Sequence, residues 1–158
     1  MLVYRICQSK YASTLIGPGI EGRWNSQNQK VIYTGGSCAL SCLEVAVHKS
    51  GASLTSGEFS ITTIEIPDKL KIIGIDIKEL GEINSEWYKA SNHLCTRFLG
   101  DEWLKSLESA VLKVPSAIIP NEFNFLLNVN HPDFSQISIK QVIKFVFDPR
   151  LKCDSNFK

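Results

Sequence analysis

Short apolar runs alternate with polar, glycine-rich stretches along most of the chain. The runs are rich in β-branched and aromatic residues, and several end at glycine, proline or asparagine, a pattern that predicts β-strands. The expected strands cover residues 1–7, 31–34, 61–66, 72–75, 110–114, 117–119, 123–127 and 141–147.

Two regions show a helical spacing of apolar residues instead. Ser37 is suited to cap a helix over residues 38–49. Residues 84–109 also predict a helix, in two pieces split near Gly100-Asp101. The expected core-facing residues are Ala39, Leu43, Ala46 and Val47 in the first helix, and Trp87, Leu94, Phe98, Trp103 and Leu107 in the second.

The remaining segments are predicted to be loops. Residues 8–30 form a long one with at most one short helix, and residues 50–60 form another. A loop as long as the first is usually functional in a small domain. Because helices fall mid-chain and strands gather towards both ends, we expect an α+β fold with a central mixed or antiparallel sheet. The length of 158 residues predicts a single domain over residues 1–158.

Composition and charge narrow the function. A net charge of +1 argues against a nucleic-acid-binding surface, and no apolar run approaches a membrane span. The first residues do not resemble a signal peptide. Five scattered cysteines fit reduced thiols in the cytoplasm, and Cys38 and Cys42 make only a weak zinc motif. No dinucleotide-binding glycine motif, P-loop or serine-hydrolase elbow occurs.

Several polar residues interrupt these patterns. Arg23 lies in the long N-terminal loop, Tyr33 inside an apolar strand, and Glu44 between Leu43 and Val45 in a helix. Each also has an ordinary explanation, such as a surface cation, a strand aromatic or a solvated helix residue. Ser116, after Pro115, and Asn128, near His131-Pro132, could equally be turn residues.

Taken together and in order, these segments resemble the RES domain, the toxin half of RES–Xre toxin–antitoxin modules. The resemblance runs from Tyr4-Arg5-Ile6 to Asp148-Pro149-Arg150-Leu151, and one departure is Val129, where the family's turn is expected to carry proline. The matching segments between these ends are Gly22-Arg23-Trp24-Asn25, Val31-Ile32-Tyr33-Thr34, Ser37 with Ala39-Leu40, Leu43-Glu44-Val45 with His48, Pro115-Ser116, Pro120-Asn121-Glu122-Phe123-Asn124, and Asn128 with His131-Pro132-Asp133-Phe134.

The resemblance implies a fold related to ADP-ribosyltransferases and NAD⁺ as a substrate rather than a cofactor, with no metal. Arg23, Tyr33 and Glu44 match the family's catalytic set, and Ser116 matches its serine. Ser37 and Asn128 are expected to join Arg23 and Tyr33 in contacting NAD⁺. Members degrade NAD⁺ by hydrolysis or phosphorolysis, or ADP-ribosylate a protein. An Xre-type antitoxin is expected to block the site, and homodimers are usual.

The expected chemistry suits these residue types. Nicotinamide leaves as a neutral base, so one carboxylate, that of Glu44, can suffice by stabilising the cationic ribose. Arg23 is expected to grip the pyrophosphate through its planar fork, and Tyr33 to offer a ring face to nicotinamide. We therefore expect Arg23, Tyr33 and Glu44 to converge in one pocket that Ser116 also reaches, with residues 17–22 and 50–57 as covers. A protein ADP-ribosyltransferase and an inert antitoxin-binding module remain alternatives.

Overall fold

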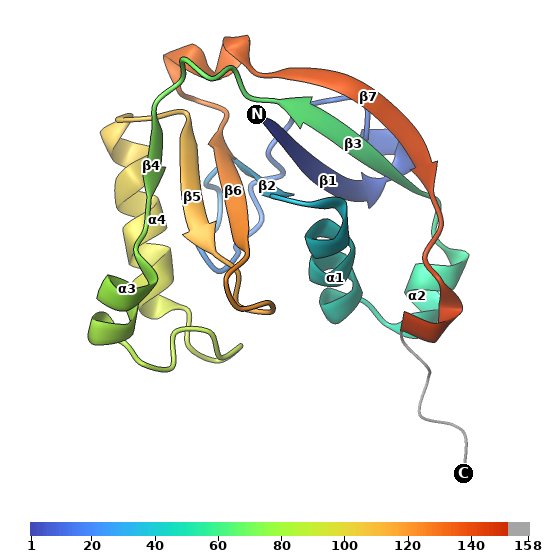
Figure 1. The fold of residues 1–158 in the computed structure, drawn as a ribbon, viewed down its shortest axis with the longest axis horizontal. Helices are drawn as coiled ribbons and strands as arrows, with labels where there is room; N and C mark the ends of the chain where they lie inside the picture. The colour runs from blue at the N-terminus through green and yellow to red at the C-terminus, as the bar shows by residue number, and fades with distance from the viewer. Residues whose placement is uncertain (152–158) are drawn as a thin grey trace.

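A mixed sheet of seven strands organises the chain in the computed structural model, which describes residues 1–151 (Figure 1). The strand order is β4-β5-β6-β2-β1-β3-β7, in which β4 and β5 are parallel and every other neighbouring pair is antiparallel. The strands are β1 (Leu2–Gln8), β2 (Val31–Gly35), β3 (Phe59–Glu65), β4 (Ile72–Gly74), β5 (Val111–Pro115), β6 (Phe123–Asn128) and β7 (Ser138–Phe145).

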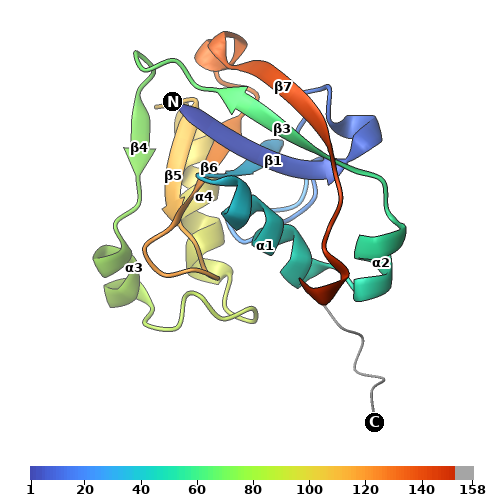
Figure 2. The same ribbon diagram turned by 45° about the vertical axis from the view of Figure 1, so that its right-hand side comes forward.

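Strands β1 and β2 are paired over only a short stretch and then diverge. β1 and β2 are in register at the pair Tyr4–Gly35, whereas β1 pairs with β3 along its whole length. The half made of β4, β5, β6 and β2 therefore stands at an angle to the half made of β1, β3 and β7 (Figures 1 and 2). This divergence leaves space for a binding site beside β1 and β2.

Four helices cover the two halves. The helices are α1 (Cys38–His48), α2 (Gly51–Ser56), α3 (Ile77–Ile83) and α4 (Leu94–Ser106), and three short 3₁₀ turns span Ser9–Tyr11, Pro132–Gln136 and Pro149–Leu151. α1 and α2 lie beside the β1-β3-β7 half, and α3 and α4 beside β4, β5 and β6 (Figure 1). Within the described chain no helix is long and apolar enough to cross a bilayer.

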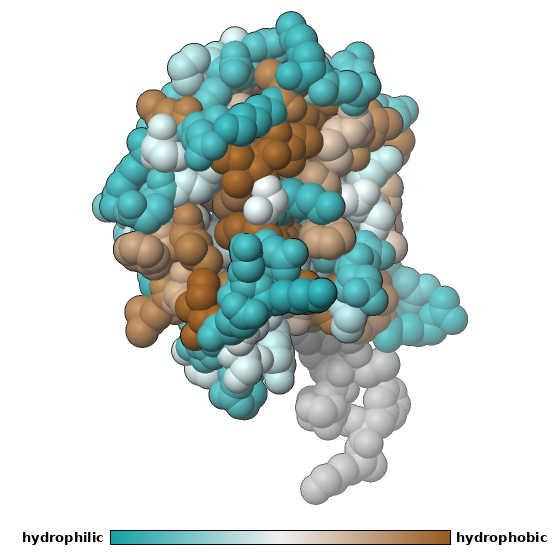
Figure 3. Space-filling model, turned by 60° about the vertical axis from the view of Figure 1, so that its left-hand side comes forward, coloured by the Kyte–Doolittle hydropathy of each residue, from teal (hydrophilic) through white to brown (hydrophobic). Residues whose placement is uncertain are grey.

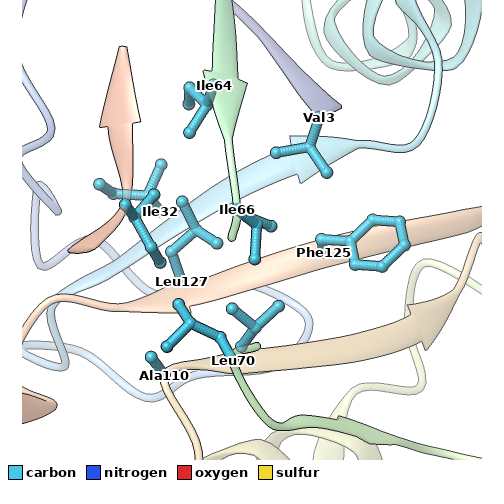
Figure 4. Close-up of a cluster of buried hydrophobic side chains, with 10 residues drawn as sticks. Val3, Ile32, Ile64, Ile66, Leu70, Ala110, Phe125 and Leu127 are labelled. Atoms are coloured by element: carbon cyan, nitrogen blue, oxygen red, sulfur yellow. The ribbon is translucent and has the colours of Figure 1, made fainter. Parts of the chain in front are cut away.

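Three clusters of buried apolar residues hold the layers together. One joins both halves of the sheet, with Val3 and Ile64 from one half and Ile32 and Leu127 from the other (Figure 4). A second packs α4 on β5 and β6 through residues such as Trp103 and Leu126, and the third seats α1 and α2 on β1 and β3. The core thus spans the point where the strands diverge, which fixes the angle between the halves.

The α+β class and the mixed sheet are confirmed, as are the strands expected near residues 1–7, 31–34, 61–66, 72–75, 110–114, 123–127 and 141–147. The strand expected over 117–119 is wrong. The Ser116 hydroxyl accepts hydrogen bonds from the backbone N–H groups of Ile118 and Ile119 at 3.1 and 3.2 Å, which turns the chain away from the sheet.

The loop expected over residues 50–60 is also wrong in part. Ser50 caps α2 by accepting a hydrogen bond from the Ser53 N–H group, and Leu54 is buried against Phe59 and Phe147. Six residues with one buried leucine give too short a pattern to separate a helix from a polar loop.

The break expected at Gly100 is absent, because α4 runs through it. A Cβ atom at position 100 would clash with the Trp24 carbonyl oxygen, so the glycine serves a close approach between helix and loop rather than a helix end. The predicted core faces were only partly right. Trp87, Trp103 and Ala46 are buried, whereas Ala39 and Val47 in α1 and Leu94, Phe98 and Leu107 around α4 are exposed.

The surface is mixed in character. Figure 3 shows brown apolar side chains reaching solvent between teal hydrophilic ones on one face of the molecule. The four cysteines in the described part of the chain, Cys7, Cys38, Cys42 and Cys95, are free thiols, and Cys153 lies outside the described residues.

Candidate functional site

A pocket of about 720 Å³ lies beside the diverging strands β1 and β2. Its walls come from these two strands, from α1, from the loop at residues 18–24 and from the beginning of α4. Arg23, Tyr33 and Glu44 all line it, although one belongs to a loop, one to a strand and one to a helix. The fold therefore brings together the three residues that the sequence singles out.

Glu44 is positioned by the way α1 docks on β1. Ser37 caps the helix by accepting a hydrogen bond from the Leu40 N–H group at 3.1 Å, and the buried Ser41 hydroxyl donates to the Tyr4 carbonyl at 2.9 Å. About one helical turn after Ser41 and two after Ser37, the half-buried Glu44 side chain faces the pocket. A capped and anchored helix holds this carboxylate more firmly than a loop would.

The Glu44 carboxylate is held on one side only. Its Oε1 atom accepts hydrogen bonds from Asn124 Nδ2 at 2.5 Å and from the Ser116 hydroxyl at 3.2 Å. No described residue donates a hydrogen bond to Oε2. We call Glu44, Ser116 and Asn124 the carboxylate wall, and it presents one unengaged anionic oxygen to the pocket.

Ser116 does not line the pocket, but its hydroxyl contacts the pocket residue Glu44. Its side chain is buried, while its neighbours Pro115 and Ala117 line the pocket. The hydroxyl donates to Glu44 and accepts from two backbone N–H groups, so its hydrogen-bonding capacity is taken up by the protein. Ser116 therefore positions the carboxylate.

Tyr33 presents its ring to the pocket and keeps its hydroxyl group inside the protein. The hydroxyl donates to Asn25 Oδ1 at 2.6 Å and accepts from the Trp24 N–H group at 3.1 Å. Burial raises the pKa of Tyr33 above its ordinary value, so the phenol stays neutral. Asn25 is fully buried and its amide group also donates to the Ile20 and Ser26 carbonyls, which ties the ring to the loop.

Arg23 uses its guanidinium group to hold a neighbouring turn. One terminal nitrogen, Nη1, donates to the Trp87 and Lys89 carbonyls at 2.5 and 3.3 Å, and Nη2 donates to the Tyr88 carbonyl at 3.0 Å. Burial lowers the pKa of Arg23, and the nearby Glu44 charge partly counters this effect. The expected fork is thus present, but in this structure it faces backbone carbonyls.

α4 clamps the loop that carries Arg23. Thr96 donates to the Arg23 carbonyl at 2.8 Å, and Asp101 accepts from both the backbone N–H and the hydroxyl of Ser26, at 2.9 and 2.5 Å. Arg97 Nε donates to the Gly22 carbonyl at 3.3 Å. We call the loop at residues 20–26 together with this face of α4 the arginine wall.

Ser37 and Asn128, which were expected to contact NAD⁺, are not among the residues that line the pocket. The Ser37 hydroxyl caps α1 and donates to Glu122 Oε2 at 3.2 Å. Asn128 is fully buried, donates to the Leu104 carbonyl at 3.3 Å and accepts from the Asn130 N–H group at 3.0 Å. The side chains of both residues make hydrogen bonds that stabilise the fold.

The two expected covers also differ. Pro18, Ile20, Glu21 and Gly22 from the first do line the pocket. The second cover, residues 50–57, contributes no residue to the lining and is mostly the helix α2.

Sequence reasoning missed several residues of the site. Asn25 and Asn124 lie within segments that carry the family resemblance, so their place beside Arg23 and Glu44 could have been suspected. His93 and Arg97 gave no such signal, because they lie about 70 residues after Arg23 in a helix whose polar face looks ordinary. Only the docking of α4 on the loop brings them to the pocket.

The pocket carries more positive than negative groups. Arg5, Arg23, Lys49 and Arg97 line it, against Glu21 and Glu44. Burial together with the charges of Arg23 and Arg97 lowers the pKa of His93, which also lines the pocket. No described cluster of His, Cys, Asp or Glu is arranged to hold a metal ion. The site is suited to an anionic organic ligand.

Comparison with known proteins finds a matching family model and similar toxins. The family model described as the RES domain matches residues 2–148. "Toxin Res" of Yersinia enterocolitica is 39% identical over 157 residues, covering 96% of this chain and 100% of that protein. "Prs ADP-ribosylating toxin" of a Sphingobium species is 33% identical over 143 residues, covering 89% and 88%.

The fold is shared with a solved structure. A chain of the M. tuberculosis MbcT–MbcA toxin–antitoxin complex superposes with a TM-score of 0.77 at 18% identity, covering 95% of this chain and 85% of that one. The match to the family model over nearly the whole chain, together with these relatives, shows that the chain belongs to the RES domain family.

Proposed function

We propose that this chain is the toxin of a toxin–antitoxin pair and that its pocket cleaves the nicotinamide–ribose bond of NAD⁺. One observation carries the proposal: the Glu44 carboxylate lines the pocket with Oε1 held by Asn124 and Ser116, and no residue among 1–151 donates a hydrogen bond to Oε2. Relatives named "Toxin Res" support the toxin role.

The pocket suits a dinucleotide in size and charge. Its volume of about 720 Å³ is large enough for a ligand of this class. Its excess of basic side chains favours a pyrophosphate group, because cations close to a partly enclosed site attract anions more strongly than in bulk water. The Tyr33 ring supplies an apolar face on which a planar nicotinamide can stack.

Glu44 is the residue on which the chemistry depends. When the C–N bond breaks, its electron pair leaves with the nicotinamide nitrogen and positive charge builds on the ribose. The free Glu44 oxygen stabilises this charge and can accept a hydrogen bond from a ribose hydroxyl. Water or phosphate then attacks the cationic carbon from the open side, and attacking water loses its proton to solvent.

The other residues position the groups that react. Asn124 and Ser116 fix the carboxylate, and Asn25 fixes the Tyr33 ring. The Tyr33 hydroxyl is engaged and stays neutral, so it has no part as a base. Arg23 keeps the turn at residues 87–89 against the loop and adds positive charge near Glu44.

Two further expectations belong to the same proposal. An Xre-type antitoxin would block the pocket, and the toxin would form a homodimer. The complex solved for MbcT, a protein of similar fold, contains a toxin and an antitoxin, which supports the first of these by analogy.

A second candidate is protein ADP-ribosylation, because one relative is named "Prs ADP-ribosylating toxin". The two reactions share the bond that breaks and differ only in the nucleophile that enters. The same Glu44 geometry would serve both.

The test is to incubate purified protein with NAD⁺ alone, with added phosphate, and with cell extract as a source of acceptor proteins. Nicotinamide with ADP-ribose identifies hydrolysis, a phosphorylated ADP-ribose identifies phosphorolysis, and a protein adduct identifies transfer. The matched variant Glu44→Gln should abolish whichever product forms. Folded protein that consumes no NAD⁺ under all three conditions would refute the proposal.

A further inference from the structure

Arg97 is a basic residue of the pocket whose present partners a ligand could replace. It lies on α4, lines the pocket and is about one-quarter exposed. Its Nε atom donates to the Gly22 carbonyl, and its Nη1 atom lies 3.4 Å from the Glu21 carboxylate. Its Nη2 atom has no hydrogen-bond partner within the described residues. Part of this guanidinium fork is therefore open.

Arg23 offers less to a ligand in the same pocket. Both of its terminal nitrogens donate to the carbonyls of residues 87–89. Binding phosphate through these nitrogens would break up to three hydrogen bonds and release the turn. The loss of these three bonds, one of them partly buried, counts against Arg23 as the first contact.

Glu21 is a partner of Arg97 that an anionic ligand could displace. Its carboxylate is more than half exposed and pairs with Arg97 at a long distance of 3.4 Å. Surface pairs of this kind contribute little to stability. A carboxylate and a phosphate both present two oxygens to a guanidinium group, so one can replace the other.

The surroundings of Arg97 favour an added anion. His93 immediately precedes α4 and also lines the pocket, and its Nε2 atom is shielded from solvent without a hydrogen-bond partner in the described chain. Burial first, and then the charges of the nearby Arg23 and Arg97, lower the pKa of His93, so two guanidinium groups lie close to this imidazole. A dianionic group would balance their charges.

We infer that Arg97 makes the direct contact with the pyrophosphate of the substrate and exchanges its Glu21 partner for that group when substrate binds. This inference rests on the proposed function and assigns a specific binding residue to it. Arg23 then acts as a positioning residue for the turn at 87–89 and for the loop. The two arginines have separate tasks within one pocket.

The inference is tested by calorimetric titration with ADP-ribose, which carries the pyrophosphate but has no bond to be cleaved, alongside NAD⁺ turnover. Arg97→Gln should weaken ADP-ribose binding about 10- to 100-fold, the range for losing a charge-assisted hydrogen-bonded contact. Arg97→Lys should recover part of the loss, since it keeps the charge but not the fork. Glu21→Gln should tighten binding several-fold, because it removes the competing carboxylate.

Lys105→Gln is the matched control, since Lys105 lies on the same helix, pairs with Glu102 and is absent from the pocket lining. It should bind ADP-ribose as the wild type does. If Arg97→Gln fails to fold, as shown by circular dichroism, Arg97→Lys and Glu21→Gln still decide the question. Wild-type affinity in either Arg97 variant that folds, or weaker binding in Glu21→Gln, would overturn the inference.

The outcome also separates this inference from the proposed function. NAD⁺ cleavage that is indifferent to Arg97 would leave the function standing and remove the inference. Binding of ADP-ribose that depends on Arg97, without any consumption of NAD⁺, would keep the inference and remove the function. A wild-type protein that binds neither compound would overturn both.

Discussion

The two walls of the pocket are built in different ways. In the carboxylate wall, side chains hold a side chain: Asn124 and Ser116 come from the β6 and β5 ends and fix Glu44 on a capped helix. In the arginine wall, side chains of α4 hold the backbone of a loop, through Thr96 to the Arg23 carbonyl and Asp101 to Ser26. The first arrangement fixes one reactive group, and the second fixes the shape of a segment.

This difference suggests a division of roles. A carboxylate that must stabilise charge in the transition state benefits from a rigid position. A loop that surrounds a dinucleotide must have a complementary shape and charge, and several residues together provide both. Changes in the carboxylate wall should therefore lower kcat, and changes in the arginine wall should mainly raise KM.

The largest effect is expected from Glu44→Gln. The glutamine oxygen can still accept from Asn124 and Ser116, so the fold and NAD⁺ binding should persist. Loss of the negative charge should lower kcat by about 10²–10³-fold with little change in KM. Steady-state kinetics on protein shown to be folded by circular dichroism will measure both. Wild-type turnover would mean that Glu44 is an ordinary helix residue.

Asn124→Ala should have the next largest effect on the same wall. It removes the shorter of the two hydrogen bonds to Oε1, and a hydrogen bond to a charged group contributes about 1.5–3 kcal/mol. We expect kcat to fall by about 10- to 100-fold, and Ser116→Ala, which removes the longer bond, to cost less. A larger loss in Ser116→Ala than in Asn124→Ala would contradict the assigned order.

Arg23→Ala should act on the opposite wall. It releases the carbonyls of residues 87–89 and removes a positive charge, so NAD⁺ binding should weaken by about tenfold while kcat falls less. Calorimetric titration with NAD⁺ and steady-state kinetics give the two quantities. A loss confined to kcat would show that Arg23 belongs functionally with Glu44.

The smallest effect on catalysis is expected from Asn128→Ala and Ser37→Ala, which lie outside both walls. Asn128→Ala should lower the free energy of unfolding by about 1–3 kcal/mol, and loss of the Ser37 cap by about 1 kcal/mol. Neither should change kcat or KM by more than about twofold at a temperature where the variants are folded. Urea denaturation and kinetics will separate the two properties, and a selective loss of NAD⁺ binding would restore these residues to the site.

The sequence was informative where local patterns and motif order coincide. Arg23, Tyr33 and Glu44 lie in segments that carry the family resemblance when they are taken together and in order, and the fold brings them to one pocket. Strand positions followed from apolar runs, which reflect burial directly. The sequence therefore indicated the proposed catalytic carboxylate, Glu44, better than it indicated the residues that surround and position it.

The rest depended on contacts between distant segments. Arg97 and Asp101 meet the loop across more than 70 residues, and no local pattern distinguishes them from solvated helix residues. Gly100 resembled a helix break but serves close packing on Trp24. Asn128 accepts from the nearby Asn130, as a turn residue does, but its contact with the Leu104 carbonyl becomes apparent only in the folded chain.

The most direct test of the account is the NAD⁺ content of cells that express the chain without an antitoxin. Wild-type protein should lower cellular NAD⁺ and stop growth, whereas Glu44→Gln at the same level of folded protein should leave both unchanged. Normal growth with unaltered NAD⁺, while folded wild-type protein accumulates, would contradict the central claim.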